Sequence, residues 1–206
     1  MTPINSDNSV ENHRHPASDL RFDGIRNRLL AQGQLPPDLT AGHNILLAGS
    51  RSGVGVTTLT IGLADSCARA SAQPILAILQ GAGDNDAPQT GDPSFAPIQR
   101  EPSQADILSF RGTDSDETNK LLSALPRFKS VYGMIFLDGG SLEDSSFSTL
   151  GRGVQRRWLV VDLRNARRSE LATLGRDLDR LTVKFDGFIA NRLVDQVPGP
   201  LAQMTS

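Results

Sequence analysis

A glycine- and hydroxyl-rich segment, Gly49 to Thr58, carries the residues of this sequence best suited to bind phosphate. It lies between an apolar run and a segment with the apolar density of a buried helix. Small residues in such a turn let backbone N–H groups point at a phosphate, and the helix N-terminus adds partial positive charge. We therefore predict a loop whose nucleotide contacts come from consecutive residues: Ser50, Arg51, Ser52, Gly53, Val54, Gly55, Val56, Thr57 and Thr58.

The loop lacks the lysine that phosphoryl transfer uses. In the pattern G/A-x-x-x-x-G-K-S/T, Ser50 stands first and Gly55 sixth, but Val56 occupies the lysine position. That lysine neutralises the β- and γ-phosphates as the transition state forms. Arg51 is an alternative source of charge within the loop, although a guanidinium at a loop tip is commonly only solvated. The other interpretation of the segment is a glycine turn without a ligand.

A second apolar run, Tyr132 to Leu137, leads directly into Asp138. A carboxylate at the end of such a strand holds Mg²⁺ or its water, and a threonine in the first turn of the helix after a phosphate loop supplies a hydroxyl ligand. We predict Thr57 and Asp138 as the metal-ligating pair, with Gly139 and Gly140 letting the backbone turn close to the ligand. The alternative is an aspartate that only caps the following turn.

The elements that would position these residues follow from hydrophobic periodicity. Strands are expected over 44–48, 75–79, 131–137, 158–161 and 185–190, and helices over 19–32, 57–70 and 168–181. In the last helix, the leucines fall on one face, which we interpret as its core face: Leu171, Leu174, Leu178 and Leu181. Continuously apolar strands that alternate with helices predict an α/β fold, with a parallel sheet covered by helices on both faces.

The composition indicates one folded domain with polar ends. The chain has 206 residues, enough for one compact domain with extensions. Residues 1–18 are nearly all polar and are predicted to be a disordered arm, 19–195 the domain, and 196–206 a tail. The Gly-, Asp- and Pro-rich stretch 81–103 is predicted to be a mobile loop at the ligand edge of the second strand, with a surface insertion as the alternative.

Charge and composition also exclude several classes of protein. The net charge of −2 disfavours a nucleic-acid partner. The sequence has no apolar stretch near the roughly 18 residues of a membrane span, so we expect no direct membrane insertion. The single cysteine, Cys67, excludes an internal disulfide and favours a reducing compartment.

The order of these segments resembles the cytosolic domain of bacterial tyrosine kinases of the CpsD/CapB and Wzc type, which act in capsule and exopolysaccharide synthesis and are relatives of the MinD/ParA ATPases. The resemblance covers roughly residues 20 to 195. It implies a P-loop NTPase fold, ATP or ADP with Mg²⁺, and contact of Asn191 with the base. It also implies self-association through a Glu-x-x-Arg-x-x-Arg motif, whose first two positions match Asp23 and Arg26, whereas Leu29 replaces the second arginine.

Two further features of that family are missing. The stretch Ile78 to Gly83 has no acid where the family's Walker A′ motif serves magnesium and catalysis, and the next acid is Asp84. The chain also ends without a tyrosine cluster, and its one tyrosine, Tyr132, begins a strand expected to be buried. We therefore expect no autophosphorylation on a tyrosine tail and a catalytically impaired relative of the kinases.

These departures favour a regulator or scaffold of a membrane polysaccharide assembly or export complex, with weak nucleotide binding. The expected partners are a membrane polysaccharide co-polymerase or export protein and further copies of the chain, and the expected location is cytoplasmic, peripheral at the inner membrane through that partner. One alternative is an active ATPase or tyrosine kinase in which Arg51 or a partner's arginine replaces the lysine. The other is a ParA- or MinD-like partitioning or positioning ATPase, for which the arginine clusters at 156–157 and 164–168 would contact DNA.

Overall fold

The computed structural model describes residues 16–37, 39, 42–81, 97–101, 104–110, 115–164 and 168–191. Its strands are β1 (His43–Gly49), β2 (Ile75–Gln80), β3 (Asp106–Phe110), β4 (Met134–Ser141), β5 (Arg156–Asp162) and β6 (Gly187–Asn191). They form one parallel sheet in the order β3-β2-β4-β1-β5-β6. The helices are α1 (Pro16–Ala31), α2 (Val56–Ala70), α3 (Ser115–Lys129), α4 (Ser145–Gly153) and α5 (Arg168–Arg180).

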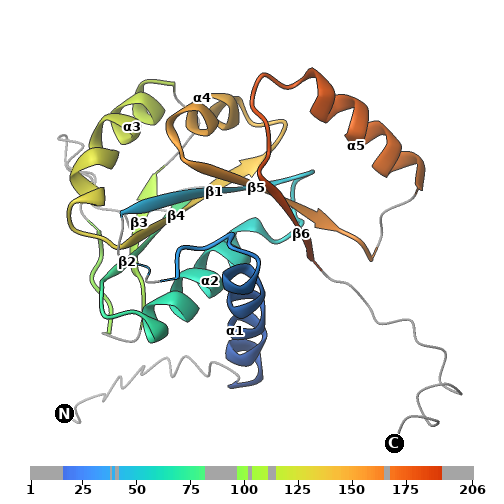
Figure 1. Ribbon diagram of the computed structural model, residues 1–206. Coiled ribbons are helices and arrows are strands. Elements are labelled where there is room, and N and C mark those ends of the chain that lie inside the picture. Colours follow the sequence, from blue (N-terminus) through green and yellow to red (C-terminus); the bar gives the residue numbers. More distant parts are fainter. Residues whose placement is uncertain are drawn as a thin grey trace, which may run out of the picture.

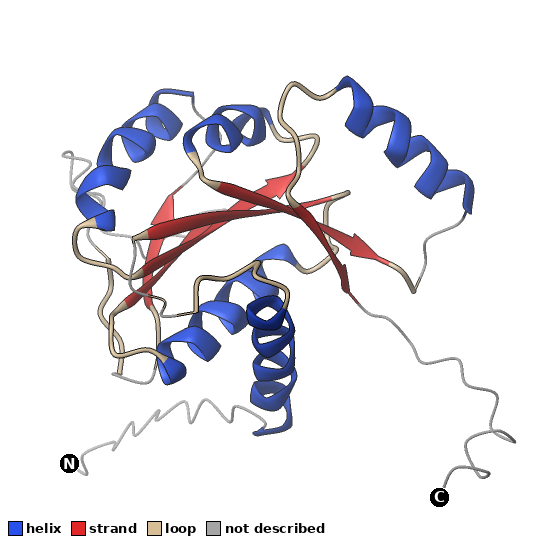
Figure 2. Cartoon of the chain, in the orientation of Figure 1, coloured by secondary structure: helices blue, strands red, loops and turns tan. Residues whose placement is uncertain are grey.

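Helices cover both faces of the sheet, as predicted. Figures 1 and 2 show α1 and α2 on one face and α3 and α4 on the other. Successive side chains of a strand point to opposite faces, so Ile45 and Leu47 enter the core beneath α1 and α2, whereas Leu46 enters the core beneath α3 and α4. Because both faces are covered, the central strands are apolar at almost every position.

Three elements lie outside the segments expected from periodicity. They are β3, a five-residue strand at the edge of the sheet, the helix α3, which contains Pro126, and the short serine-rich helix α4. The helix α3 has an apolar face of its own, since Leu121, Leu125 and Phe128 recur at helical spacing and are buried against the sheet. The sequence thus contains a signal for α3 that the expected elements omit, whereas β3 is a five-residue edge strand with little signal of its own.

Several boundaries differ from those expected. Helix α1 begins at Pro16, within the stretch predicted as a disordered arm, and β4 begins at Met134 and continues through Asp138 to Ser141. Residues 1–15, 82–96 and 192–206 lie outside the described residues, so the arm, most of the predicted mobile loop and the tail stay predictions. At the far end of that loop, Ile98 pairs antiparallel with Ile107 of β3.

The leucine face of α5 is only partly buried. Leu171 is 41% exposed, and none of the described side chains of α5 is buried. Figure 1 places α5 on the same side as α3 and α4, near the end of the sheet formed by β5 and β6. Phe188 of the edge strand β6 is 65% exposed. The prediction of a core face therefore holds only in part, since Leu181, just after α5, packs against the core beneath α3 and α4, whereas Leu171 is exposed.

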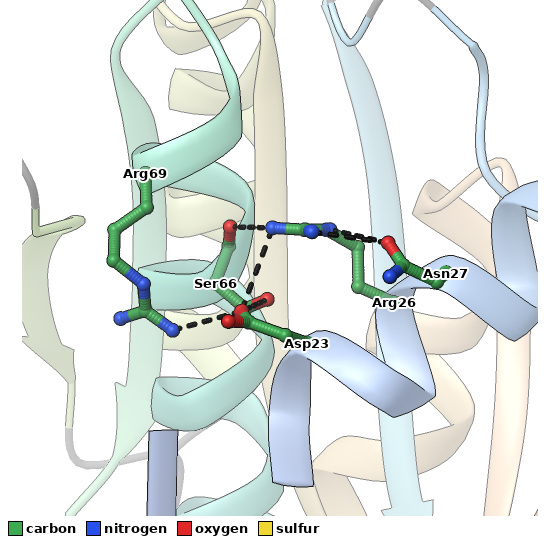
Figure 3. Close-up of polar contacts among 5 residues, drawn as sticks. All are labelled: Asp23, Arg26, Asn27, Ser66 and Arg69. Atoms are coloured by element: carbon green, nitrogen blue, oxygen red, sulfur yellow. Dashed lines mark hydrogen bonds and ion pairs between the residues drawn. The ribbon is translucent and has the colours of Figure 1, made fainter. Parts of the chain in front are cut away.

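Helix α1 is fixed on α2 by apolar and polar contacts. The ring of Phe22 lies over Gly62, where a Cβ would come within 2.5 Å of the ring carbons. The Asp23 carboxylate accepts hydrogen bonds from Ser66 Oγ at 2.5 Å and from Arg69 at 2.9 Å (Figure 3). Arg26 lies 3.5 Å from the same carboxylate and donates to the Ser66 carbonyl oxygen at 2.5 Å. The two residues that match the family's self-association motif thus contact α2 of their own chain.

Replacing Asp23 by asparagine is expected to lower the free energy of unfolding by about 1 kcal/mol at neutral pH, because a charged acceptor at a partly exposed site is lost. The hydrogen bond from Ser66, together with Arg69 and Arg26, lowers the pKa of Asp23 despite its partial burial. The stabilising effect of the Asp23 carboxylate is therefore fully present above the pKa of Asp23 in the unfolded chain, and it is lost as the pH falls through the pKa in the folded protein. Urea unfolding of wild type and Asp23→Asn should differ at neutral pH and converge in acid.

An exposed arginine on the same helix, Arg28, provides the matched control. Arg28→Ala should unfold like wild type at both pH values. A difference between wild type and Asp23→Asn that is equally large at neutral and acid pH would show that the carboxylate charge does not hold α1 on α2.

Candidate nucleotide and magnesium site

The carboxyl ends of the parallel strands bring the predicted site residues to one edge of the sheet. Gly49 ends β1, Gln80 ends β2, Asp162 ends β5 and Asn191 ends β6, while Asp138 lies near the end of β4. Strand β1 is flanked by β4 and β5. The strands β2, β3 and β4 lie on one side of β1, whereas β5 and β6 lie on its other side. Ligands of open α/β sheets bind at such a switch point.

The phosphate loop leaves β1 at Gly49 and enters α2 at Val56. Gly53 and Gly55 have φ angles of +77° and +92°, which glycine adopts without a steric penalty. Gly49 must also be small, since a Cβ there would lie 2.7 Å from a methyl of Val54 and 2.8 Å from the carbonyl oxygen of Arg51. The loop is therefore a tight turn onto the N-terminus of α2, where backbone N–H groups can bind an anion.

Side chains along the loop divide into exposed and buried ones. Ser50 is half-buried and donates its N–H to the Val160 carbonyl oxygen at 2.9 Å. Val54 is buried, and the exposed residues are Arg51, Ser52, Gly53, Thr57 and Thr58.

Neither Val56, which occupies the lysine position, nor Arg51, the alternative source of charge, turns a positive charge towards the loop. Val56 is 8% exposed and belongs to the core beneath α1 and α2, with one methyl turned towards Gly49. Arg51 has a half-exposed side chain whose guanidinium lies 3.9 Å from the buried carboxylate of Asp162. The charge of Arg51 is thus directed to the end of β5. Sequence reasoning did not single out Asp162, although it follows an apolar run as Asp138 does.

Thr57 and Asp138, the predicted metal ligands, are in contact. Thr57 Oγ1 donates to Asp138 Oδ2 at 2.5 Å, and the Gly140 N–H donates to Oδ1 at 2.9 Å. Asp138 is 1% exposed, and this burial raises the pKa of its carboxyl, opposed by the two hydrogen bonds. A cation beside both oxygens would offset the cost of burying the carboxylate.

The oxygen set fits Mg²⁺, which prefers hard oxygen ligands and completes its shell with phosphate and water. Among the described residues there is no group of three or more His, Cys, Asp or Glu side chains that could hold a metal ion. Thr57 and Asp138 would therefore hold Mg²⁺ together with a bound nucleotide rather than alone.

Asn191 is brought to the loop, and both ends of its side-chain amide are hydrogen-bonded. Its Nδ2 donates to the Val54 carbonyl oxygen at 2.7 Å, and its Oδ1 accepts from Arg21 at 2.6 Å. Its contact with a nucleotide base stays a prediction. Arg21 was not predicted as a site residue. It lies 170 residues from Asn191 in the chain, and the residues around it form no motif of a binding site.

No protein-family model matches the sequence, and no curated protein matches it. Solved structures do match. The kinase domain of Escherichia coli tyrosine kinase ETK has a TM-score of 0.65 at 17% identity, over 94% of this chain and 89% of that one. The VpsO kinase domain has a TM-score of 0.60 at 20% identity, over 86% of this chain and 95% of that one. This chain has a bacterial tyrosine-kinase-like P-loop fold.

The same P-loop fold extends to a ParA family ATPase from Chlorobium tepidum TLS, with a TM-score of 0.52 at 14% identity, over 74% of this chain and 75% of that one. The comparisons thus bear out the fold of the resembling family and of its ATPase relatives. None of the described helices is long and apolar enough to cross a membrane.

In this tyrosine-kinase-like fold, the end of β2 carries an amide where the resemblance implies an acid. Gln80 Oε1 accepts a hydrogen bond from Ser146 at 3.4 Å and lies beside Gly140. Asp84, the next acid along the chain, lies outside the described residues. A second carboxylate comes instead from Asp144, which accepts the Ser141 N–H at 2.6 Å and whose charge also raises the pKa of Asp138.

Tyr132 is buried, as expected. It is 7% exposed, and its hydroxyl donates to Asp106 Oδ2 at 2.8 Å. Burial, with the Asp106 charge, raises the pKa of this hydroxyl above its usual value. A phenol held in this way is not presented to a kinase site.

Proposed function

We propose that this protein is a catalytically impaired relative of the bacterial tyrosine kinases that binds ATP or ADP with Mg²⁺ and regulates or scaffolds a polysaccharide assembly complex at the membrane. One observation carries the proposal. The Thr57–Asp138 pair and the glycine loop are kept, while the position of the catalytic lysine holds Val56, which is packed into the core.

These features separate nucleotide binding from phosphoryl transfer. Backbone N–H groups and the α2 N-terminus provide ground-state contacts with phosphates, and Thr57 and Asp138 provide oxygens for Mg²⁺. Rate acceleration needs additional charge where it develops on the transferred phosphoryl group. Val56 supplies none, and Arg51 lies against Asp162 at the end of β5. Binding without efficient turnover is the result we expect.

The polysaccharide part of the proposal is supported by the fold of the kinase domains and by the sequence resemblance to capsule and exopolysaccharide kinases. A membrane polysaccharide co-polymerase or export protein is the proposed partner. The protein is proposed to act as a homo-oligomer in the cytoplasm, at the inner membrane through that partner.

The proposal is tested by calorimetric titration of the purified protein with Mg·ATP and Mg·ADP, beside a phosphate-release assay at high protein concentration. Binding without turnover supports it. Turnover would show an active ATPase or kinase and would direct attention to Arg51. The absence of binding at millimolar nucleotide would leave a scaffold whose glycine loop has no ligand.

Thr57→Ala is expected to weaken Mg·ADP binding roughly tenfold while leaving binding of ADP in EDTA nearly unchanged, because only the metal contact is lost. Thr182→Ala is the matched control, since Thr182 is an exposed threonine that precedes the amino end of β6, at the opposite edge of the sheet from the loop. Calorimetry with and without Mg²⁺ measures both. Equal losses in the two variants, or a loss that persists in EDTA, would contradict a metal-binding role for Thr57.

A further inference from the structure

Arg21 of α1 is linked to the phosphate loop by two hydrogen bonds in series. Its guanidinium donates to Asn191 Oδ1 at 2.6 Å, and Asn191 Nδ2 donates to the Val54 carbonyl oxygen at 2.7 Å. Asn191 is 7% exposed and also borders Gly55, where a Cβ would lie 2.8 Å from Nδ2. We infer that Arg21 is a positioning residue of the nucleotide site that acts on the loop through Asn191, an inference that rests on the proposed function.

The donors and acceptors of Arg21 and Asn191 explain which end of the Asn191 amide contacts Arg21 and which end contacts Val54. An asparagine amide has one accepting and one donating end, whereas a guanidinium only donates. Arg21 therefore engages the oxygen of Asn191 and leaves the NH₂ group for the Val54 carbonyl. Without Arg21, the amide of Asn191 has a weaker preference for this orientation.

The loop depends on that orientation because its backbone is easily rearranged. Gly53 and Gly55 flank Val54 and both have positive φ angles, so the intervening peptide groups have few steric restraints. The bond from Asn191 holds the Val54 carbonyl oxygen on the side of β6. A carbonyl oxygen that turned to the phosphate side would repel the anion that the N–H groups attract.

The position of Arg21 is itself set by independent contacts. The ring of Phe22 packs at Gly62, and Asp23 is bonded to Ser66 and Arg69 (Figure 3). Removal of the Arg21 guanidinium therefore leaves α1 docked on α2.

The test compares the Mg·ADP affinity of five variants with that of wild type by calorimetry. Arg21→Ala should bind about fivefold more weakly than wild type, since a partly exposed charge-assisted hydrogen bond is lost. Arg21→Lys should recover most of the affinity, and Arg28→Ala should bind like wild type. The double variant Arg21→Ala/Asn191→Ala should bind no more weakly than Asn191→Ala alone, because Arg21 acts through Asn191.

A second measurement is independent of nucleotide. In the free protein, amide hydrogen exchange of residues 53–57 should be faster in Arg21→Ala than in Arg28→Ala, with cooperative thermal unfolding retained in both. Unchanged exchange overturns the inference, as does an affinity loss that adds to that of Asn191→Ala. If wild type binds no Mg·ADP, the proposed function fails, and the exchange rates alone decide whether Arg21 positions the loop.

Discussion

Replacement of Val56 by lysine is expected to tighten Mg·ATP binding about tenfold, because one charge-assisted hydrogen bond to a terminal phosphate contributes roughly 1.5–3 kcal/mol and tenfold in affinity is about 1.4 kcal/mol. The side chain of Val56 already turns back towards Gly49 at the base of the loop. A lysine stem following the same direction carries its ammonium to the phosphate side. Mg·ATP should gain more than Mg·ADP, since the lysine contacts both β- and γ-phosphates.

Val56→Met is the control for the stem without the charge. Both variants should lose about 1–3 kcal/mol of stability, since a longer side chain replaces a valine that is packed into the core. Calorimetry measures the affinities and urea unfolding the stabilities. Equal affinities of the lysine and methionine variants for Mg·ATP would show that phosphates do not bind at this loop. We expect phosphate release to stay slow, because β2 ends in Gln80 and not in an acid.

Replacement of Asp138 by asparagine is expected to have opposite effects on binding and on stability. Nucleotide binding in Mg²⁺ should weaken roughly 10- to 100-fold, as is usual when a polar group that holds a metal or its ligands is changed. The free protein should become more stable, since the amide is not penalised by burial as the carboxylate is. Its NH₂ group can donate to the Thr57 hydroxyl, and its oxygen can accept from Gly140.

The pH dependence of stability tests the same prediction. Burial raises the pKa of Asp138, so the folded protein retains this proton at a pH where the unfolded chain has lost it. Stability of the free protein should therefore fall as the pH rises from the unfolded-state pKa through the folded-state pKa. Asp138→Asn should remove this decline, and Mg²⁺ with ADP should reverse it in wild type, since the cation binds the carboxylate form.

Asp144→Asn provides the matched control, with the same change of charge beside the site but no contact with Thr57. It should retain Mg²⁺-dependent binding within about threefold, because an exposed charge acts weakly. Thermal unfolding across pH, together with calorimetry in Mg²⁺ and in EDTA, compares the three proteins. A destabilised Asp138→Asn protein that binds Mg·ADP normally would place the metal elsewhere.

Much of the sheet could be predicted because its central strands are apolar on both faces. Segments 44–48, 75–79 and 158–161 became the strands β1, β2 and β5, and the glycine loop lay between β1 and α2 as expected. The parallel fold with helices on both faces follows from the same pattern. The Thr57–Asp138 contact was also predictable, because each residue lies at a fixed offset from a recognisable strand.

Elements at the edge of the fold were less predictable. β3 is a short edge strand with a weak local signal, and the regular leucines of α5 predicted a fuller burial than the exposed Leu171 shows. Periodicity reports which face of a helix is apolar, but it does not report whether another element is there to cover it.

The sequence by itself determined the apolar strands of the parallel fold, the glycine loop, the aspartate at the end of a strand and the absence of the lysine, because each is read from residues adjacent in the chain. Only the tertiary structure decided that Arg51 lies against Asp162 and that Arg21 reaches the loop through Asn191. These contacts join residues on separate strands and helices. Their distances are set by how the elements pack, and no local pattern of residues encodes that packing.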